Sequence, residues 1–174
     1  PDHDESTRII HAALDAGVNF VDTADIYSQG ESEEIVAKAI AGRRDDIVLA
    51  TKFHGAMGDD PNRQGSSRRW IIQEVENSLR RLQTDIIDLY QSHKDDETTP
   101  QEETLAAYDK LIKAGKIRAI GASNFSAERL KSALDIAKAN GLPRYESMQP
   151  EYSLAERSSY EGALQRVCVE NDVG

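Results

Sequence analysis

The stretch that decides the fold is Ile47-Val48-Leu49-Ala50-Thr51-Lys52, an unbroken apolar run that ends in two polar residues. Runs of this kind are typical of parallel strands, which are covered on both faces. Other short runs of this character occur along the chain, and longer segments with helical spacing of apolar residues separate them. Because parallel strands need crossover connections, this alternation predicts a parallel α/β sheet.

The pattern predicts about five strands and six helices. The expected strands are residues 18–22, 47–52, 86–91, 118–122 and, more weakly, 146–149. The expected helices are residues 5–16, 31–41, 67–82, 100–114, 127–140 and 158–171. Glycines follow four of these helices, where a left-handed cap favours glycine: Gly17, Gly42, Gly115 and Gly141. Thr99, before Pro100, and Ser126 are expected to cap two helix N-termini.

A parallel α/β sheet is either doubly wound and open or closed into a barrel. An open sheet that binds dinucleotides usually carries GxGxxG after its first strand, and no such motif is present. We therefore expect a parallel (β/α)₈ TIM barrel, with residues 1–174 forming a single incomplete barrel domain.

Composition limits the partners and the compartment. The net charge of −10 and the pI of about 4.9 argue against nucleic acid and anionic membranes, which attract positive patches. No apolar run approaches the roughly 18 residues that span a bilayer. The single cysteine, Cys168, allows no disulfide within the chain, which suits a reducing compartment, and we expect a cytoplasmic protein.

Polar residues stand at or just beyond the ends of the expected strands: Asp22, Lys52, His93, Ser123, Asn124 and Gln149. In a parallel barrel these ends share one rim, where the active sites of this fold lie. Polar residues also end strands simply because the chain leaves the core, but an acid, a base and a histidine on consecutive strands favour a site. Asp25 is interpreted as a loop or cap residue. Asp22, His93, Asp95 and Asp96 lack the spacing of metal ligands, so no metal is expected.

The same residues belong to motifs that resemble the aldo/keto reductase family. Residues 17–27, Gly-Val-Asn-Phe-Val-Asp-Thr-Ala-Asp-Ile-Tyr, followed by Gly30 and Ser32-Glu33, look like the signature around the catalytic aspartate and tyrosine. Residues 48–52 resemble the lysine strand of the family, and residues 78–93 resemble its histidine strand. Matches continue in family order through residues 99–105, 115–118, 120–125 and 149–154.

The resemblance implies a (β/α)₈ barrel that reduces aldehydes and ketones to alcohols. The implied catalytic residues are Asp22, Tyr27, Lys52 and His93. The residues implied to hold the carboxamide of the nicotinamide are Ser123, Asn124 and Gln149. The resemblance also implies NADP(H) as the cofactor and a small carbonyl compound as the substrate.

This chemistry needs a proton donor, because hydride attack leaves negative charge on the carbonyl oxygen. A tyrosine hydroxyl is protonated at neutral pH and can donate. The ammonium of Lys52 would stabilise the phenolate that donation leaves, and Asp22 would hold Lys52 charged and in place. His93 can hydrogen-bond the carbonyl oxygen and orient it.

Two other functions fit the same fold. Lys52, at a strand end, could form a Schiff base in a lyase of the aldolase type. The chain could also be a cofactor-binding regulatory subunit with little turnover, as are the potassium-channel β subunits of this family.

The five expected strands fall short of the eight in a closed barrel. Family order places the first strand before Pro1 and the next strand after Gly174. Family order also places after Gly174 the aromatic ring that stacks on the nicotinamide and the basic residues that bind the 2′-phosphate of the cofactor. We expect residues 1–174 alone to be inactive and poorly folded, because an open sheet exposes its edges; cooperative unfolding with NADPH turnover would contradict this.

Overall fold

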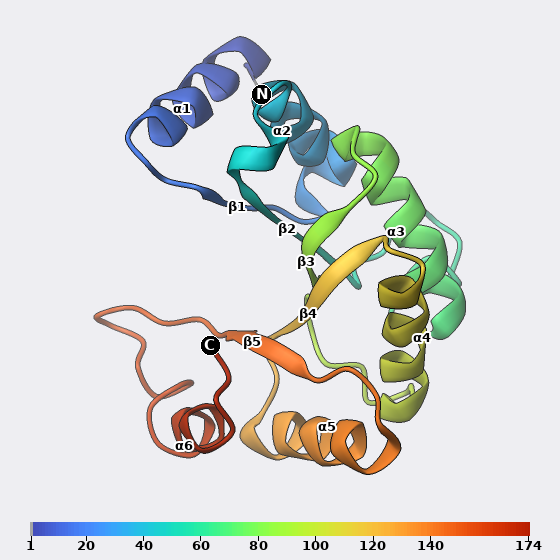
Figure 1. The fold of residues 1–174 in the computed structure, drawn as a ribbon. Helices are drawn as coiled ribbons and strands as arrows, with labels where there is room; N and C mark the ends of the chain where they lie inside the picture. Colours follow the sequence, from blue (N-terminus) through green and yellow to red (C-terminus); the bar gives the residue numbers. More distant parts are fainter. Residues whose placement is uncertain (1) are drawn as a thin grey trace.

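The protein, seen here as a computed structural model that describes residues 2–174, is built on one sheet of five parallel strands in the order β1-β2-β3-β4-β5. The strands are β1 (Phe20–Asp22), β2 (Val48–Phe53), β3 (Ile87–Ser92), β4 (Ile117–Ser123) and β5 (Tyr145–Gln149). Each strand pairs in parallel with the next along the chain. The sheet is curled into a half-barrel (Figure 1).

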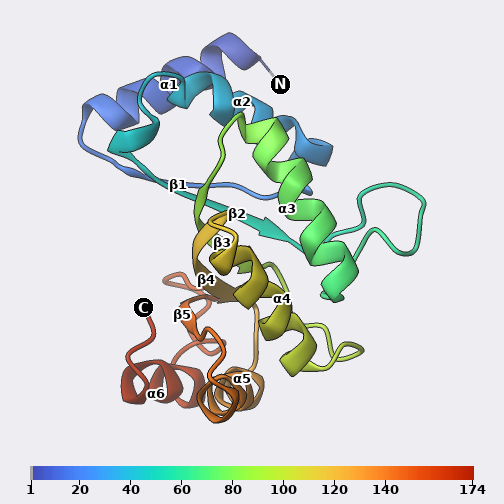
Figure 2. The same cartoon turned by 45° about the vertical axis from the view of Figure 1, so that its right-hand side comes forward.

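Six α-helices in the described residues follow one another around the outside of the sheet (Figures 1 and 2). They are α1 (His3–Asp15), α2 (Glu31–Ile40), α3 (Arg68–Leu82), α4 (Gln101–Lys113), α5 (Ala127–Asn140) and α6 (Ala163–Glu170). Each helix contacts the next one in sequence. The expected partial (β/α)₈ barrel is therefore confirmed. None of these helices combines the length and the apolar character that a membrane crossing requires.

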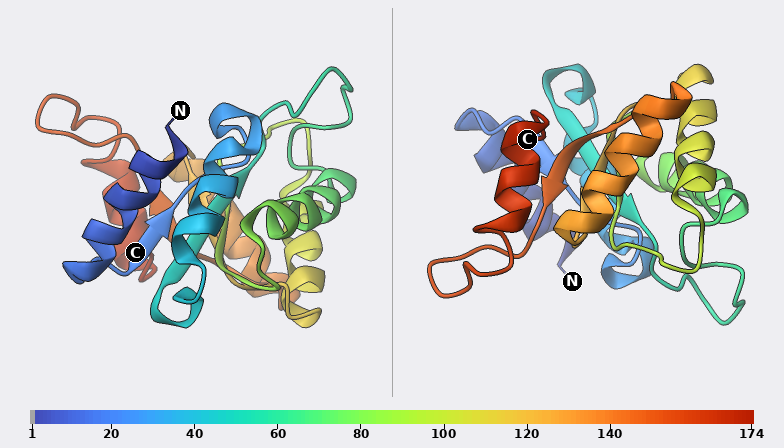
Figure 3. Two further views of the ribbon diagram at one scale, coloured as in Figure 1. Left: turned by 90° about the horizontal axis from the view of Figure 1, so that it is seen from above. Right: turned by 90° about the horizontal axis from the view of Figure 1, so that it is seen from below.

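The inner face of the half-barrel is open beside β1 and β5, which each pair with only one neighbour within residues 2–174. Phe20 is 49% exposed and Val48 is 37% exposed along this open side. The chain between β5 and α6 also projects from the body (Figure 3), and Leu154 within it is 97% exposed.

An ionic cluster joins the strands at the end of the sheet where they begin. The carboxylate of Asp88 lies 2.8 Å from the Arg44 guanidinium and 2.9 Å from that of Arg118. It also accepts the Leu49 N–H at 2.8 Å, and Arg44 donates to the Ile86 carbonyl at 2.7 Å. In this fold that end serves stability, which leaves the opposite rim for chemistry.

Two expected elements begin later in the structure by two residues or more. The strand expected at residues 18–22 begins only at Phe20. The reason is that Gly17 N–H and Val18 N–H still close the end of α1, on the carbonyls of Leu14 and Ala13. The helix expected at residues 158–171 begins only at Ala163, because Gly162 has φ 100° and breaks the preceding turn.

The expected helix caps are mostly confirmed. All four glycines after helices have positive φ, from 64° at Gly141 to 92° at Gly17. Ser126 Oγ accepts the Arg129 N–H at 3.2 Å and caps α5. The cap expected at Thr99 is wrong. Pro100 is the N-cap of α4, and the Thr99 hydroxyl instead donates to Asp96 at 2.8 Å.

Candidate active site

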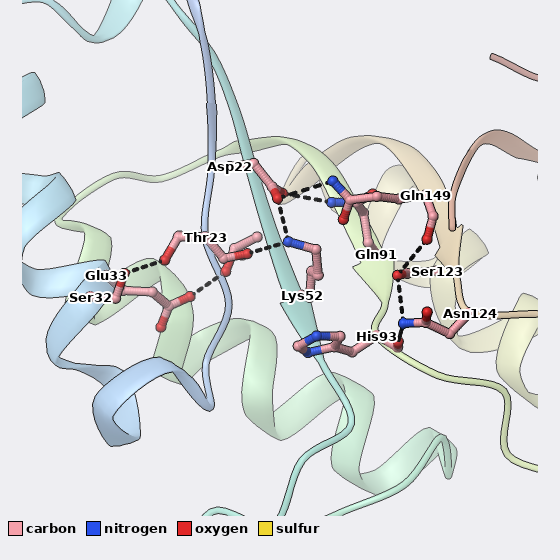
Figure 4. A network of polar contacts seen from close by, with 11 residues as sticks. Asp22, Thr23, Ser32, Glu33, Lys52, Gln91, His93, Ser123, Asn124 and Gln149 are labelled. Atoms are coloured by element: carbon pink, nitrogen blue, oxygen red, sulfur yellow. Dashed lines mark hydrogen bonds and ion pairs between the residues drawn. The ribbon is translucent and has the colours of Figure 1, made fainter. Parts of the chain in front are cut away.

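The C-terminal ends of the strands bring the polar residues expected from the sequence to one rim (Figure 4). Strand register places Lys52 of β2 opposite Gln91 of β3, and Ser123 of β4 opposite Gln149 of β5. Asp22 is the last residue of β1, and His93 follows β3 directly. Residues far apart in the sequence therefore meet because parallel strands end together.

Lys52 is buried at this rim, with its ammonium directed to two oxygen atoms. Its Nζ lies 2.5 Å from Asp22 Oδ2 and donates to the Thr23 carbonyl at 3.0 Å. The Lys52 side chain is 1% exposed, whereas that of Asp22 is 26% exposed. A buried cation must be paired and hydrogen-bonded, and these contacts meet that need and fix the direction of the lysine side chain.

Two amide side chains hold the carboxylate of Asp22. Gln91 Nε2 donates to Oδ1 at 2.9 Å, and Gln149 Nε2 donates to Oδ2 at 3.3 Å. Gly121 makes room for this arrangement, because a Cβ there would lie 2.5 Å from Ser147 Oγ and 3.0 Å from Gln91 Cγ. The role of Gln91 was not predicted from the sequence. The available signal was its place on the inner face of β3, two residues before His93.

Tyr27 begins a short 3₁₀ turn, η1 (Tyr27–Gly30), that overhangs the lysine. Its ring centroid is 5.5 Å from Lys52 Nζ, and its ring meets that of His93 edge-on at 5.7 Å between centroids. The side chain is 43% exposed, so a reactant can reach it. Ser28 and Gln29 in this turn adopt left-handed φ values of 49° and 54°, at about 1–2 kcal/mol each. Strain of this kind persists only where surrounding contacts hold the backbone.

His93 is half-buried beside the lysine. Burial, and then the nearby positive charge of Lys52, lower the pKa of the His93 imidazole from its usual value. The ring is therefore neutral at pH 7, with one N–H able to donate a hydrogen bond. Its backbone carbonyl accepts Asn124 Nδ2 at 3.0 Å, which links the histidine to the end of β4.

Ser123, Asn124 and Gln149 form a second polar group on the same rim. The Ser123 hydroxyl donates to the Gln149 carbonyl at 2.8 Å, and Asn124 Nδ2 donates to Ser123 Oγ at 3.0 Å. Asn124 has a left-handed φ of 57°, which turns its side chain back toward β3. Within residues 2–174 the Asn124 Oδ1 has no donor bound to it, and the residue is exposed. This donor and acceptor set fits a carboxamide group.

Asp25 lies in the loop after β1, as expected, but it caps no helix and is completely buried. Neither carboxyl oxygen has a hydrogen-bond partner among the described residues. Burial, and then the charges of Glu74 and Glu33, raise the pKa of Asp25 to about 8. Across residues 2–174 no three His, Cys, Asp or Glu side chains are arranged to hold a metal ion.

Comparison with known proteins identifies relatives of this chain. Residues 1–174 match the sequence model of the Aldo/keto reductase family. Aldo-keto reductase YhdN of Bacillus subtilis is 47% identical over 165 residues, which are 92% of this chain and 48% of that protein. Aldo-keto reductase dtxS3 of Metarhizium robertsii is 38% identical, over 99% of this chain and 53% of that protein. A probable voltage-gated potassium channel subunit beta of Oryza sativa is 38% identical, over 90% and 48%.

The chain spans about half the length of the curated relatives that it matches. Within that half lie the five strands whose ends form the rim described above.

Proposed function

Because the chain belongs to the aldo/keto reductase family, we propose that the polypeptide in which it occurs reduces aldehyde and ketone carbonyls to alcohols with NADPH. The observation that carries this proposal is the convergence of Tyr27, Lys52, Asp22 and His93 at one rim. The accessible tyrosine lies over a buried lysine whose ammonium is bound to a carboxylate.

In this proposal Tyr27 donates the proton. As negative charge develops on the carbonyl oxygen, the Tyr27 hydroxyl transfers its proton to that oxygen. The Lys52 ammonium, fixed by Asp22, stabilises the phenolate that remains. An ammonium bound to Asp22 and the Thr23 carbonyl has no free lone pair, which disfavours a Schiff base on Lys52.

His93 places the substrate. Its neutral ring has one N–H, which can donate to the carbonyl oxygen and hold it near Tyr27. Since the ring pKa is lowered, His93 is a poor source of the transferred proton at neutral pH. Orientation by His93 and donation by Tyr27 are therefore separate tasks.

A nicotinamide cofactor supplies the hydride when it is bound. Ser123, Asn124 and Gln149 would hold its carboxamide, since they offer hydroxyl and amide groups at one rim. The choice of NADPH rests on the family. The acidic net charge of −10 supports a small-molecule partner rather than nucleic acid or an anionic membrane, and the single cysteine supports a cytoplasmic location.

The test follows the oxidation of NADPH by the natural polypeptide that contains these residues, across aldehydes and ketones of varied size. We expect turnover, and a loss of roughly 100-fold or more in Tyr27→Phe, which keeps the ring but removes the proton. Tyr160→Phe is the matched control, because Tyr160 lies far along the chain beside α6 and packs on Tyr152. Unchanged turnover in Tyr27→Phe would exclude Tyr27 as the donor.

A second candidate is a cofactor-binding regulatory subunit with little turnover. The similarity to a relative named as a potassium channel subunit beta favours it. Tight NADPH binding without turnover on any carbonyl tested would support this function against the first one.

A further inference from the structure

A buried ionic cluster lies between the sheet and the helices, behind the rim. Arg81 of α3 donates through Nε to Glu33 Oε2 at 2.6 Å and through Nη2 to Glu74 Oε1 at 2.5 Å. Glu33 and Glu74 are both completely buried, and the Arg81 side chain is 18% exposed. One guanidinium therefore serves two buried carboxylates, and its planar fork suits this geometry better than a lysine would.

Arg81 also contacts the turn that carries Tyr27. A Cβ on Gly30, the last residue of η1, would lie 2.6 Å from Arg81 Cδ and 2.9 Å from Arg81 Nε. The stem of the arginine is therefore packed directly against the backbone of this turn. Gly30 has φ 98° and precedes α2, so it sets the direction in which the turn enters the helix. The left-handed residues Ser28 and Gln29 lie between Tyr27 and this support.

The cluster reaches the lysine strand as well. The Thr51 hydroxyl donates to Glu33 Oε1 at 2.6 Å, and both residues are completely buried. Successive residues of a strand point to opposite faces, so Thr51 faces the helices while Lys52 faces the inside of the barrel. In Figure 4 Glu33 accordingly lies on the other side of the β2 ribbon from Gln149.

A neighbouring contact ties β1 to the same helical turn. The hydroxyls of Thr23 and Ser32 are 2.8 Å apart, and the Thr23 carbonyl accepts the Lys52 ammonium. Ser32 and Glu33 are consecutive residues in the first turn of α2. The first turn of α2 is therefore hydrogen-bonded both to the end of β1 and to β2, and Arg81 binds the same turn through Glu33.

We propose that Arg81, through its contacts with Glu33 and Gly30, is a positioning residue that fixes Tyr27 over Lys52. The inference rests on the proposed function, in which these two side chains form the proton-donating pair. Arg81 touches neither of them. It acts through η1 on one side and through Glu33 and Thr51 on the other.

The test compares Arg81→Lys, which keeps the charge and loses the fork, with Arg80→Lys. Arg80 is exposed on the same helix, and within residues 2–174 its side chain bonds only to Asn77, at 3.1 Å, so it is the matched control. Both variants are made in the natural polypeptide and assayed well below their melting temperatures. We expect kcat to fall about tenfold or more in Arg81→Lys, since small misplacements are costly, with KM and the Kd for NADPH nearly unchanged. Equal kcat in the two variants would overturn the proposal.

A second measurement does not depend on turnover. With 3-fluorotyrosine incorporated, the ¹⁹F resonance of Tyr27 is assigned by its absence in Tyr27→Phe. We expect this resonance to move or broaden in Arg81→Lys and to stay in place in Arg80→Lys. A moved resonance in a protein without any turnover would refute the reductase function but retain the positioning role. An unmoved resonance would refute the positioning role alone.

If Arg81→Lys does not fold, the variants Thr51→Val and Thr51→Ser are compared instead. Thr51→Val removes the hydroxyl that bonds Glu33 at nearly constant shape, whereas Thr51→Ser keeps it. We expect Thr51→Val to lower kcat and move the Tyr27 resonance, whereas Thr51→Ser should keep the kcat and the resonance position of the wild type. If Thr51→Val matches Thr51→Ser in both readouts, the cluster does not position Tyr27.

Discussion

Asp25→Asn is expected to stabilise the protein, and to do so more strongly as the pH rises. Asp25 is fully buried, and its carboxyl oxygens have no hydrogen-bond partner within residues 2–174. Burial and the nearby Glu74 and Glu33 raise its pKa from 3.8 to about 8. The Ile26 N–H and then the charge of Arg81 lower the pKa, but each by less than burial and the two glutamates raise it.

The sign and size of the effect follow from proton linkage. Well below pH 3.8 the folded and unfolded states both hold the Asp25 proton, so the group has no effect. Between pH 3.8 and about 8 the unfolded chain releases the proton while the folded chain keeps it, and stability falls with rising pH. At about 1.4 kcal/mol per pH unit, the cost by pH 8 is on the order of 5 kcal/mol. Asparagine cannot ionise and does not carry this cost.

Denaturant unfolding of the natural polypeptide from pH 4 to pH 8 measures this difference. The stability of Asp25→Asn relative to wild type should be near zero or slightly negative at pH 4, because a buried amide also lacks partners, and should rise toward pH 8. Asp59→Asn, at an exposed position, is the control and should follow wild type. Parallel curves for Asp25→Asn and wild type would show that Asp25 is ionised in the folded protein and would refute this reasoning.

Three further outcomes are expected at the rim. Lys52→Met should lower kcat by roughly 100-fold without loss of NADPH binding, measured by cofactor fluorescence, because the stabilising ammonium is gone. Gln91→Leu should lower kcat by about tenfold, because Asp22 loses its 2.9 Å amide contact; an unchanged kcat would show that Gln149 alone suffices. The His93 ring should titrate by NMR with a midpoint below its ordinary value, and stability should fall as the pH drops below that ordinary value, because the unfolded chain then takes up a proton that the folded chain does not; a midpoint at or above the ordinary value would contradict this.

The fold was predictable because its signals are local and repeated. Each strand core was expected correctly, since continuous apolar runs alternate with segments of helical spacing. The failures lie where a backbone contact overrides the pattern. The pattern predicts that a strand begins at Val18, but the Val18 N–H donates to the Ala13 carbonyl at the end of α1. Residues 158–162 read as helix, but Gly162 interrupts them.

The candidate site was predictable in its members but not in its supports. Strand ends and family motifs point to Asp22, Lys52 and His93, because the period of the sheet places such residues at one rim. Gln91, Glu33 and Arg81 lie within the matched motifs, but the sequence assigned them no role, since a polar residue within a strand or helix usually faces solvent. Their contacts depend on which elements become neighbours in space.

Strand β2 separates two neighbouring polar groups: the residues at the rim around Lys52 and the buried cluster of Arg81, Glu33 and Glu74. Lys52 and Thr51 are adjacent in sequence, both are buried, and they face opposite sides of the sheet. In the proposed function, the polar group at the rim must expose Tyr27 to a reactant, while the cluster of Arg81, Glu33 and Glu74 must exclude water so that its charges interact strongly. Because the strand places one residue of each group side by side, the ionic cluster can support the rim from behind without entering the open side where the proposed substrate would bind Tyr27.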